Sequence, residues 1–429
     1  MRESSYPLVS VEDALAGVLS RVAPMQVREL PLQEALGLVL AEDVHAALDL
    51  PSFRAAVVDG FALRAADGSA ARRLVGEQMA GAPLDLVVDA GTAVRITTGA
   101  PVPPGADVVI KVELSDEESG WVTPHQGETL MAGQNIRPVG SDIAAGELVL
   151  RAGQMLGPAE LGMLASLGRS HAPVHRRPLV GVFSTGDELA DFGQVLGPGQ
   201  IYDSNRATLL AAVAQAGGQP LDLGILRDQP GELERGLARG LAQADVLVTS
   251  GGVSMGELDL LKPLLERWGA VHFGRVRMKP GKPLTFATLP ARGADGEIAA
   301  GQPARPVFAL PGNPVSSLVT FQLFVRPAIR RMLGIGHAGL PFLEVTLGHS
   351  FRLDPERAEF HRVTLTREDG QIVARSTGSQ ASSRLLSAAG ADGLLVLEQA
   401  DGLLPAGSRR PVLLLNDNWL ATPEDDRSG

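Results

Sequence analysis

The chain has 429 residues, of which 45% are hydrophobic and 20% are charged, and its formal net charge at pH 7 is -11. This length exceeds what one ordinary hydrophobic core accommodates, so we expect about three domains. The acidic balance and an aromatic content of 4% disfavour a broad nucleic-acid-binding face. The chain has no cysteine, which excludes disulfides, thiolate metal sites and cysteine nucleophiles.

The N-terminal stretch MRESSYPLVSVEDALAGVL lacks the basic-then-apolar pattern of a signal peptide. The chain has no run of about 18 apolar residues, so we expect no transmembrane helix. We therefore expect a cytoplasmic protein without membrane or nucleic-acid partners.

Residues 9–44 have a helical pattern. The stretch SVEDALAGVLSRV begins with Ser10 as an N-cap and carries Glu12 and Asp13 in its first turn. PLQEALGLVL predicts a second short helix. From about residue 53 to 150, short β-like runs alternate with Gly and Pro turns, which predicts a small β-rich domain. GPAELGMLASLG is helical again, so this domain is expected as an insertion in a helical segment.

Strands and helices alternate in residues 178–333. PLVGVFSTG, LDLGILRD, ADVLVTS and PVFALPGN read as apolar strands, and SNRATLLAAVAQAGG as a helix capped by Ser204. Such strands predict a parallel sheet covered on both faces, a doubly wound α/β domain that binds ligands beyond the carboxyl ends of its strands. After about residue 334, several β-like runs predict a compact all-β C-terminal domain, and the tail TPEDDRSG is expected to be disordered.

Polar residues follow each strand of the predicted α/β sheet, and the sheet topology should bring them to one crevice. The stretch RVRMKPGKP, which lies between two of these loops, adds the cations Arg275, Arg277, Lys279 and Lys282. The residues that follow the strands are Ser184, Thr185, Asp187, Glu188, Asp228, Ser250, Gly251, Gly252, Ser254, Glu257, Asp259 and Asn313.

A glycine turn with flanking hydroxyls suits a phosphate, and carboxylates beside it suit a divalent cation held by oxygen ligands. The residues therefore indicate an enzyme that acts on an anionic, phosphorylated ligand with a metal ion. Simpler roles remain open: Asp259 could cap the following helix, Asp187 and Glu188 could lie in a solvated loop, and the lysines could be surface charges. No Walker A pattern is present. GVSMG (252–256) has the spacing G-x-S-x-G, and GIGHAG (334–339) has the spacing G-x-G-x-x-G but follows a predicted helix and not a strand.

The chain resembles the molybdopterin molybdenumtransferase family, the MoeA proteins of bacteria and the E domain of gephyrin, from about residue 7 to 415. The motifs that carry this resemblance occur in the family's order: VDGFALRAAD, TTGAPVPPGADVVI, GQNIRPVGSDI, FSTGDEL, GQIYDSNR, SGGVSMGELD, MKPGKP, LPGNPVSS and GSQASS. The resemblance implies an elongated helical region (1–50 and 146–177), an inserted β domain (51–145), a doubly wound α/β, molybdopterin-binding, MogA-like domain (178–333), a C-terminal β barrel (334–420) and a disordered tail (421–429).

The family's reaction inserts molybdenum: adenylylated molybdopterin and molybdate give molybdenum cofactor and AMP, with Mg2+ or another divalent cation. The resemblance also implies a homodimer whose active site joins the α/β domain of one subunit to the β domain of the other. Molybdopterin adenylyltransferase and molybdoenzyme chaperones are expected as possible partners.

Site residues are carried over from the matching motifs. The resemblance implies catalytic roles for Asp59, Glu188, Asp228, Asp259 and Lys279, with Asp228 and Asp259 as metal ligands, Glu188 orienting the pterin or nucleotide, and Lys279 and Lys282 on phosphate or molybdate. Substrate-binding roles are expected for Thr98, Arg137, Asp142, Ser184, Thr185, Gly251, Gly252, Ser254, Arg275, Lys282, Pro311, Asn313 and Ser382, and Arg357 is a further match in the C-terminal domain.

Three places depart from the family pattern. Before Asp-Gly the family reads close to D-N-S-A-M, whereas residues 54–58 read R-A-A-V-V, so amide and hydroxyl donors are lost and an arginine replaces an acid. Arg275 stands where lysine is common, and Ala381 replaces a usual glycine.

Two other functions remain open. Proteins that adenylylate molybdopterin have a similar α/β domain but characteristically carry a T-G-G-T-G turn, whereas this chain has TSGGVSMG. The altered residues 54–58 motivate a non-catalytic carrier or scaffold that binds molybdopterin. The complete set of acids and lysines weighs against that reading.

Overall fold

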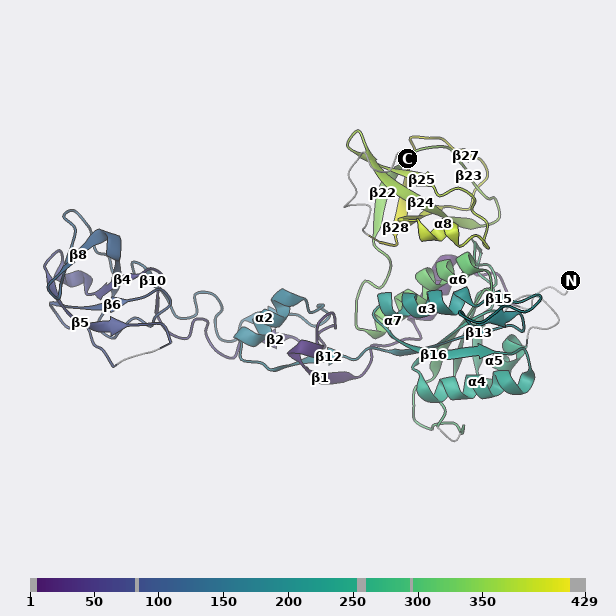
Figure 1. Cartoon of the computed structure of the whole chain (residues 1–429), viewed down its shortest axis with the longest axis horizontal. Helices are drawn as coiled ribbons and strands as arrows, with labels where there is room; N and C mark the ends of the chain where they lie inside the picture. The colour runs from purple at the N-terminus through teal and green to yellow at the C-terminus, as the bar shows by residue number, and fades with distance from the viewer. Residues whose placement is uncertain (1–5, 82–84, 253–259, 294–295, 417–429) are drawn as a thin grey trace. The chain divides into compact units, whose positions relative to one another are not determined.

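The structure is a computed structural model that describes residues 6–81, 85–252, 260–293 and 296–416 (Figure 1). The chain divides into two compact units. Unit 1 comprises residues 1–41 and 173–429, and unit 2 comprises residues 42–172. No helix of the described ranges combines the length and the apolar character needed to cross a bilayer.

Unit 2 is built on a six-stranded sheet in the order β7-β4-β6-β5-β9-β8. Its second strand β4 (Gly60–Leu63) is buried on both faces, because Phe61 and Leu63 pack into one small apolar core and Ala62 into another. The β-rich character predicted for this region is confirmed. The other strands are β5 (Arg72–Gln78), β6 (Thr92–Ile96), β7 (Val108–Lys111), β8 (Ser115–Glu118) and β9 (Trp121–Pro124).

Short elements complete unit 2. Strand β3 (Ala55–Ala56) pairs with β10 (Ile136–Arg137), and β2 (Val44–His45) pairs with β11 (Leu148–Leu150). The predicted return to helix is confirmed as α2 (Pro158–Ser166), which has proline in its first turn. Strand β12 (His171–His175) crosses the boundary into unit 1 and pairs with β1 (Val27–Pro31), and single 3-10 turns lie at η2 (Ala65–Asp67) and η3 (Val112–Leu114).

The helical expectation for residues 9–44 is only half right. Helix α1 (Val11–Leu19) forms as predicted, and Ser10 caps it by accepting a hydrogen bond from the Asp13 amide. PLQEALGLVL is not a helix: β1 (Val27–Pro31) leads into a 3-10 turn, η1 (Leu32–Glu34). Residues 38–40 are all buried, and an amphipathic helix cannot bury three consecutive side chains on one face.

The α/β sheet of unit 1 has the order β16-β13-β17-β21-β20-β18. Four strands are parallel: β16 (Gln219–Leu226), β13 (Leu179–Thr185), β17 (Val246–Ser250) and β21 (Arg305–Leu310). The expectation of a wholly parallel sheet fails at β20 (Thr285–Leu289), which pairs antiparallel with β21 and with β18 (Ala270–Phe273). The described residues between β20 and β21 contain no crossover helix, and the two strands pair as a hairpin with a long connection.

Helices cover both faces of this sheet, as the near-continuous apolar strands predict. Val246 and Val248 pack into one core with α3 (Ser204–Gln215), while Leu247 packs into the other with α4 (Pro230–Gln243) and α5 (Leu261–Trp268). Figure 1 shows α4 and α5 on one side of the sheet and α3 on the other, with α6 (Pro314–Thr320) and α7 (Arg326–Met332). One π-type stretch, η4 (Phe321–Val325), joins α6 to α7.

The C-terminal region is a closed five-stranded barrel, which confirms that prediction. Strand β24 (Ala358–Glu368) pairs with β25 and β26, β28 pairs with β26 and β22, and β22 pairs with β25. Strand β19 (Met278–Lys279) leaves the α/β domain and pairs with β24. The remaining elements are β22 (Phe342–Leu347), β23 (Phe351–Arg352), β25 (Gln371–Ser376), α8 (Leu386–Ala389), β26 (Gly393–Leu397), β27 (Leu403–Leu404) and β28 (Arg409–Leu414).

Candidate functional site

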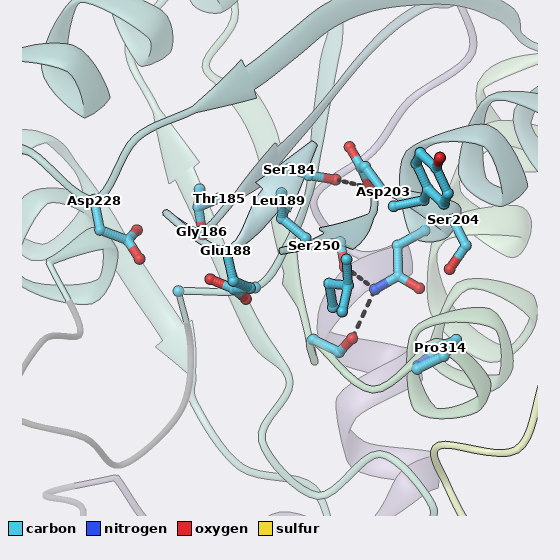
Figure 2. Close-up of a pocket in the computed structure, with 16 residues that line it drawn as sticks. Ser184, Thr185, Gly186, Glu188, Leu189, Asp203, Ser204, Asp228, Ser250 and Pro314 are labelled. Atoms are coloured by element: carbon cyan, nitrogen blue, oxygen red, sulfur yellow. Dashed lines mark hydrogen bonds between the residues drawn. The ribbon is translucent and has the colours of Figure 1, made fainter. Parts of the chain in front are cut away.

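A cavity of about 270 Å³ opens at the carboxyl ends of β13, β16, β17 and β21, where the topology predicts a ligand site (Figure 2). It brings together six residues expected from the sequence: Ser184, Thr185, Glu188, Asp228, Gly251 and Gly252. It also contains residues that were not predicted: Gly186, Leu189, Ile201, Tyr202, Asp203, Ser204, Asn205, Gly312 and Pro314. Ser250, noted at its strand end, lines it too.

The glycine turn requires glycine at both positions. Gly251 and Gly252 have φ of +90° and +69°, which L side chains rarely adopt. A Cβ on Gly251 would also lie 2.6 Å from the carbonyl oxygen of Thr185. The turn therefore passes directly against the end of β13.

The Thr185 hydroxyl is the second feature of the cavity. It is buried and has no hydrogen-bond partner within the described part of the chain. A Cβ on Gly252 would lie 2.9 Å from it, so the hydroxyl faces the glycine turn. Buried hydroxyls are usually paired, and one left open beside a glycine turn suits an oxygen-rich ligand.

Two carboxylates, Glu188 and Asp228, line the cavity, and the charge of Asp187 also acts on Asp228. Burial raises the pKa of Asp228, and the charges of Asp187 and Glu188 raise it further. Figure 2 shows the Asp228 and Glu188 carboxylates facing the same space. This excess of negative charge favours a bound cation or a proton.

A buried network lies behind the cavity wall. Ser184 Oγ donates to Asp203 Oδ1 at 2.9 Å (Figure 2), and Asp203 also accepts hydrogen bonds from the backbone amide and Nε of Arg206. Burial raises the pKa of Asp203, although these hydrogen bonds oppose the shift. Helix α3 is therefore capped by Asp203, not by Ser204 as predicted.

Asn205 joins three parts of the site. Its Nδ2 donates to Ser250 Oγ at the end of β17 and to the carbonyl of Gly312 after β21, both at 2.7 Å. Its Oδ1 is buried and has no partner among the described residues. The sequence carries a signal for these residues, because GQIYDSNR is one of the shared motifs, but it predicts no site role for any of them.

The C-terminal domain reaches the edge of this cavity. Asn313 caps α6 at the cavity rim, and its Nδ2 donates to Ser382 Oγ at 3.1 Å. The backbone amide of Val315 donates to the Ser382 carbonyl at 3.0 Å. The carbonyl of Pro311 lies 3.5 Å from Ser250 Oγ. These contacts place the predicted residues Pro311, Asn313 and Ser382 beside the cavity.

Lys279 lines a different cavity, of about 650 Å³, on the C-terminal barrel. Its Nζ lies 2.6 Å from Glu359, a buried carboxylate that also contacts His361 at 3.2 Å. Burial alone would raise the pKa of Glu359, but the hydrogen bonds from His361 and Lys279 lower it to about 2. The carboxylate is therefore a permanent anion that holds Lys279.

The other predicted cations of this region, Arg275, Lys282 and Arg357, each lie among different neighbours. The carbonyl of Arg275 accepts from the Val9 amide, and that of Lys282 accepts from Val276. Arg357 donates to Asp354 at 3.4 Å, and Asp354 lines the Lys279 cavity. Neither of the two cavities is lined by Arg275 or Lys282.

In unit 2 the four expected residues form two polar pairs. Asp59 accepts hydrogen bonds from the Thr98 amide and hydroxyl, at 2.7 and 2.9 Å, and these lower the pKa of Asp59. Arg137 forms a two-pronged ion pair with Asp142. Strand β3 links the pairs, since Ala55 lies opposite Arg137 and the Ala56 carbonyl accepts from Gly99.

Arg54, the departure from the family pattern, has a structural contact. Its guanidinium donates to the Ala106 carbonyl at 3.2 Å, and its own carbonyl accepts from the Val102 amide. The arginine thus braces the turn in TTGAPVPPGAD. It does not disturb the Asp59–Thr98 pair.

Ser254, Glu257 and Asp259 lie outside the described residues. The predicted cap of α5 by Asp259 therefore stays a prediction. In the structure α5 begins after Leu260, whose apolar side chain makes no capping hydrogen bond. In the described part of the chain, no three His, Asp or Glu side chains are placed together as a metal-ligand set.

Family models match nearly all of the chain. The models described as MoeA N-terminal region (domain I and II), probable molybdopterin binding domain and MoeA C-terminal region (domain IV) match residues 9–168, 181–331 and 344–415, respectively.

Individual relatives agree with these matches. The chain is 36% identical to the molybdopterin molybdenumtransferase of Haemophilus influenzae, over 93% of this chain and 97% of that one. It is 39% identical to gephyrin of Dictyostelium discoideum over 96% of its own length but spans only 63% of gephyrin. The crystal structure of a molybdopterin biosynthesis MoeA protein from Pyrococcus horikoshii superposes with a TM-score of 0.82, at 30% identity, over 96% of this chain and 100% of that chain. Sequence motifs, architecture and these relatives converge, and the chain belongs to the molybdopterin molybdenumtransferase (MoeA) family.

Proposed function

We propose that this chain is a molybdenum insertase that uses molybdate and adenylylated molybdopterin to form the molybdenum cofactor and releases AMP. Membership of the family makes it a transferase of molybdenum cofactor biosynthesis. The observation that carries the proposal is the cavity at the carboxyl edge of the sheet, where a glycine turn, an open hydroxyl and clustered carboxylates meet.

The chemistry of the cavity residues suits such a substrate. The Gly251–Gly252 turn and the Thr185 hydroxyl would hold phosphate oxygens. The Ser184 hydroxyl donates a hydrogen bond to Asp203, so its oxygen can accept a hydrogen bond from an N–H or O–H of the ligand. Glu188 would accept from the pterin or nucleotide in the same way. Together these groups orient the phosphoanhydride for cleavage.

A divalent cation, expected to be Mg2+, belongs to the proposal. When bound, such an ion neutralises charge at a phosphate or polarises an oxygen. The raised pKa of Asp228 beside Asp187 and Glu188 supports a site for a cation. Asp228 would hold the ion together with Asp259, whose position lies outside the described residues.

Lys279 and Lys282 are proposed to bind molybdate or phosphate. In the structure Lys279 is paired with Glu359, so an incoming anion would share the ammonium with that carboxylate. The Nζ of Lys279 also lies 3.7 Å from Asp354, so two carboxylates hold the ammonium in place, and an anion would bind through an N–H donor that Glu359 does not use. The same proposal includes a catalytic role for Asp59 and substrate-binding roles for Thr98, Arg137 and Asp142.

We further propose that the protein acts as a cytoplasmic homodimer in which one active centre takes residues from both subunits, as the family resemblance implies. Contacts with molybdopterin adenylyltransferase and with molybdoenzyme chaperones remain predictions.

The test is a direct assay. Purified protein is incubated with adenylylated molybdopterin, molybdate and Mg2+, and AMP release is followed together with the molybdenum bound to the pterin. Molybdate-dependent AMP release that matches the molybdenum bound is the expected result. Tight binding of the pterin without AMP release would instead favour the carrier function, and AMP release that ignores molybdate would contradict insertion.

A further inference from the structure

Arg206, in the first turn of α3, is the most heavily bonded cation behind the cavity. Arg206 is only 4% exposed. Nη1 donates to both oxygens of Asp222 on β16, at 2.8 and 2.7 Å, and Nε donates to Asp203 at 3.0 Å. Nη2 pairs with Asp191, just after β14 (Leu189–Ala190). One guanidinium therefore joins a strand, a helix start and a loop.

The loop that Arg206 holds connects two short strands that line the cavity. Residues 191–200 connect β14 to β15 (Ile201–Tyr202), and both short strands line the cavity. The loop exposes apolar side chains, with Phe192 61% and Val195 95% exposed. Such a loop gains little stability from burial.

Few contacts tie this loop to the domain. The Arg206 guanidinium pairs with Asp191 and lies 5.5 Å from the centre of the Phe192 ring. The hydroxyl of Tyr202 donates to the Gln194 carbonyl at 2.9 Å, which is a contact within the β14–β15 connection itself. In these contacts, Arg206 is the residue that connects the loop to helix α3 and to the sheet.

The geometry of the site explains why an arginine is needed. The planar guanidinium presents donors along separate edges, so it meets Asp203, Asp222 and Asp191 at once. A lysine ammonium is a point charge and cannot span three carboxylates in this way. Asp203 is only 2% exposed, and its carboxylate accepts three hydrogen bonds, from Ser184, from the Arg206 amide and from Arg206 Nε.

We propose that Arg206 is a positioning residue for this cavity. By fixing Asp203 it sets the direction of the Ser184 hydroxyl, and by holding Asp191 it fixes the connection between β14 and β15, the two strands that line the cavity. The inference rests on the proposed function for the identity of that ligand. Arg206 makes no contact with substrate and acts through Asp203 and the loop.

A second buried ion pair in the same domain provides a matched control. Arg176 donates to both oxygens of Asp245, at 2.6 and 2.9 Å, and Asp245 also accepts from the Leu179 amide. Leu179 begins β13, whereas the cavity lies where β13 ends. Arg176 therefore has the chemistry of Arg206 without its place beside the cavity.

The experiment compares Arg206→Lys, Asp191→Asn and Arg176→Lys. Steady-state kinetics are measured for adenylylated molybdopterin at saturating molybdate, and amide hydrogen exchange is measured for residues 187–203. Arg206→Lys is expected to raise KM about tenfold with kcat changed less than about twofold, because a lost binding geometry acts on substrate and transition state alike. Asp191→Asn, which leaves the buried pair intact, should raise KM about threefold and speed exchange in the loop. Arg176→Lys should lower Tm and leave KM unchanged.

The inference is overturned if Arg206→Lys and Arg176→Lys lower Tm alike while KM and loop exchange stay at wild-type values. Asp191→Asn keeps the test open if Arg206→Lys does not fold. Absence of turnover in the wild type would count against the proposed function alone. In that case, the affinity for AMP is measured by calorimetry, together with amide exchange in the loop. If Asp191→Asn leaves both the AMP affinity and the exchange rates unchanged, the inference is wrong.

Discussion

At the residue scale, the cavity is dominated by carboxylates that the fold forces together. Asp187 and Glu188 follow β13, and Asp228 follows β16, which lies beside β13 in the sheet. Burial and these neighbouring charges raise the pKa of Asp228. Its ionisation therefore costs folding free energy, and this cost falls when the group is protonated, bound to a cation or replaced by an amide.

Asp228→Asn should accordingly separate stability from activity. Without divalent cations we expect Tm to rise by roughly 2 °C, because one of three clustered charges is removed. Insertion activity should fall by at least about a hundredfold. Differential scanning fluorimetry and the AMP-release assay measure the two effects. Asp401→Asn, an exposed carboxylate on the barrel, is the control and should change neither; a fall in Tm for Asp228→Asn would contradict the argument.

Glu359 gives a prediction on pH. Its pKa is lowered from 4.5 to about 2, so its contribution to stability is complete above pH 4.5 and is lost as pH falls toward 2. Glu359→Gln should reduce the unfolding free energy by about 2 kcal/mol at neutral pH. The gap between variant and wild type should narrow between pH 4.5 and pH 2, as followed by thermal unfolding. A gap that stays constant over this range would show that Glu359 is not held as a paired anion.

At the scale of elements, the site depends on the connection from β17 to the glycine turn. Residues 246–250 form a strand buried along its whole length, and the chain then turns at two glycines with positive φ against Thr185. The turn is therefore fixed by sterics as well as by backbone preference. The Gly251 amide donates to the Leu310 carbonyl at 3.1 Å, which ties the turn to the end of β21.

Gly251→Ala should damage this element. The positive φ and the 2.6 Å approach of a Cβ to the Thr185 carbonyl predict a loss of about 1–3 kcal/mol in unfolding free energy, with a shift of the turn. Activity should drop at least about tenfold, since the turn that lines the cavity moves. Gly162→Ala on α2, where a Cβ meets nothing within 4 Å, should instead stabilise the protein by about 0.5–1 kcal/mol. Equal effects of the two substitutions in denaturant unfolding would refute the steric argument.

At the scale of the whole molecule, the expected site residues fall into both compact units. Asp59, Thr98, Arg137 and Asp142 belong to unit 2, and the α/β cavity belongs to unit 1. Under the proposed homodimer, each active centre takes its residues from two copies of the chain. Subunit mixing tests this arrangement without any assumption about geometry.

Asp59→Asn and Asp228→Asn should each be inactive alone but should complement each other when co-expressed. Random assortment gives half mixed dimers, each with one intact centre, so about a quarter of wild-type activity is expected. AMP release by the co-purified proteins measures recovery, and native mass spectrometry counts the mixed dimers. Mixed dimers without recovered activity would mean that both residues act within one subunit.

Much of the α/β domain follows from the sequence alone. Apolar runs of five to eight residues predict its buried strands, and glycines and carboxylates at the strand ends predict a polar cavity at the carboxyl edge, because parallel strands end at one edge. The longer motifs of the sequence also indicate the family. These features are local, so a pattern of neighbours along the chain suffices to find them.

The tertiary structure decided what depends on partners distant in sequence. The antiparallel placement of β20, the pairing of Lys279 with Glu359, and the extended backbone of residues 38–40 arise from contacts with other segments. The roles of Asp203 and Asn205 were likewise hidden in a recognised motif, since their partners are Ser184, Ser250 and Gly312. Hydrogen bonds and ion pairs act over a few ångströms, and only the folded chain brings such groups within that distance.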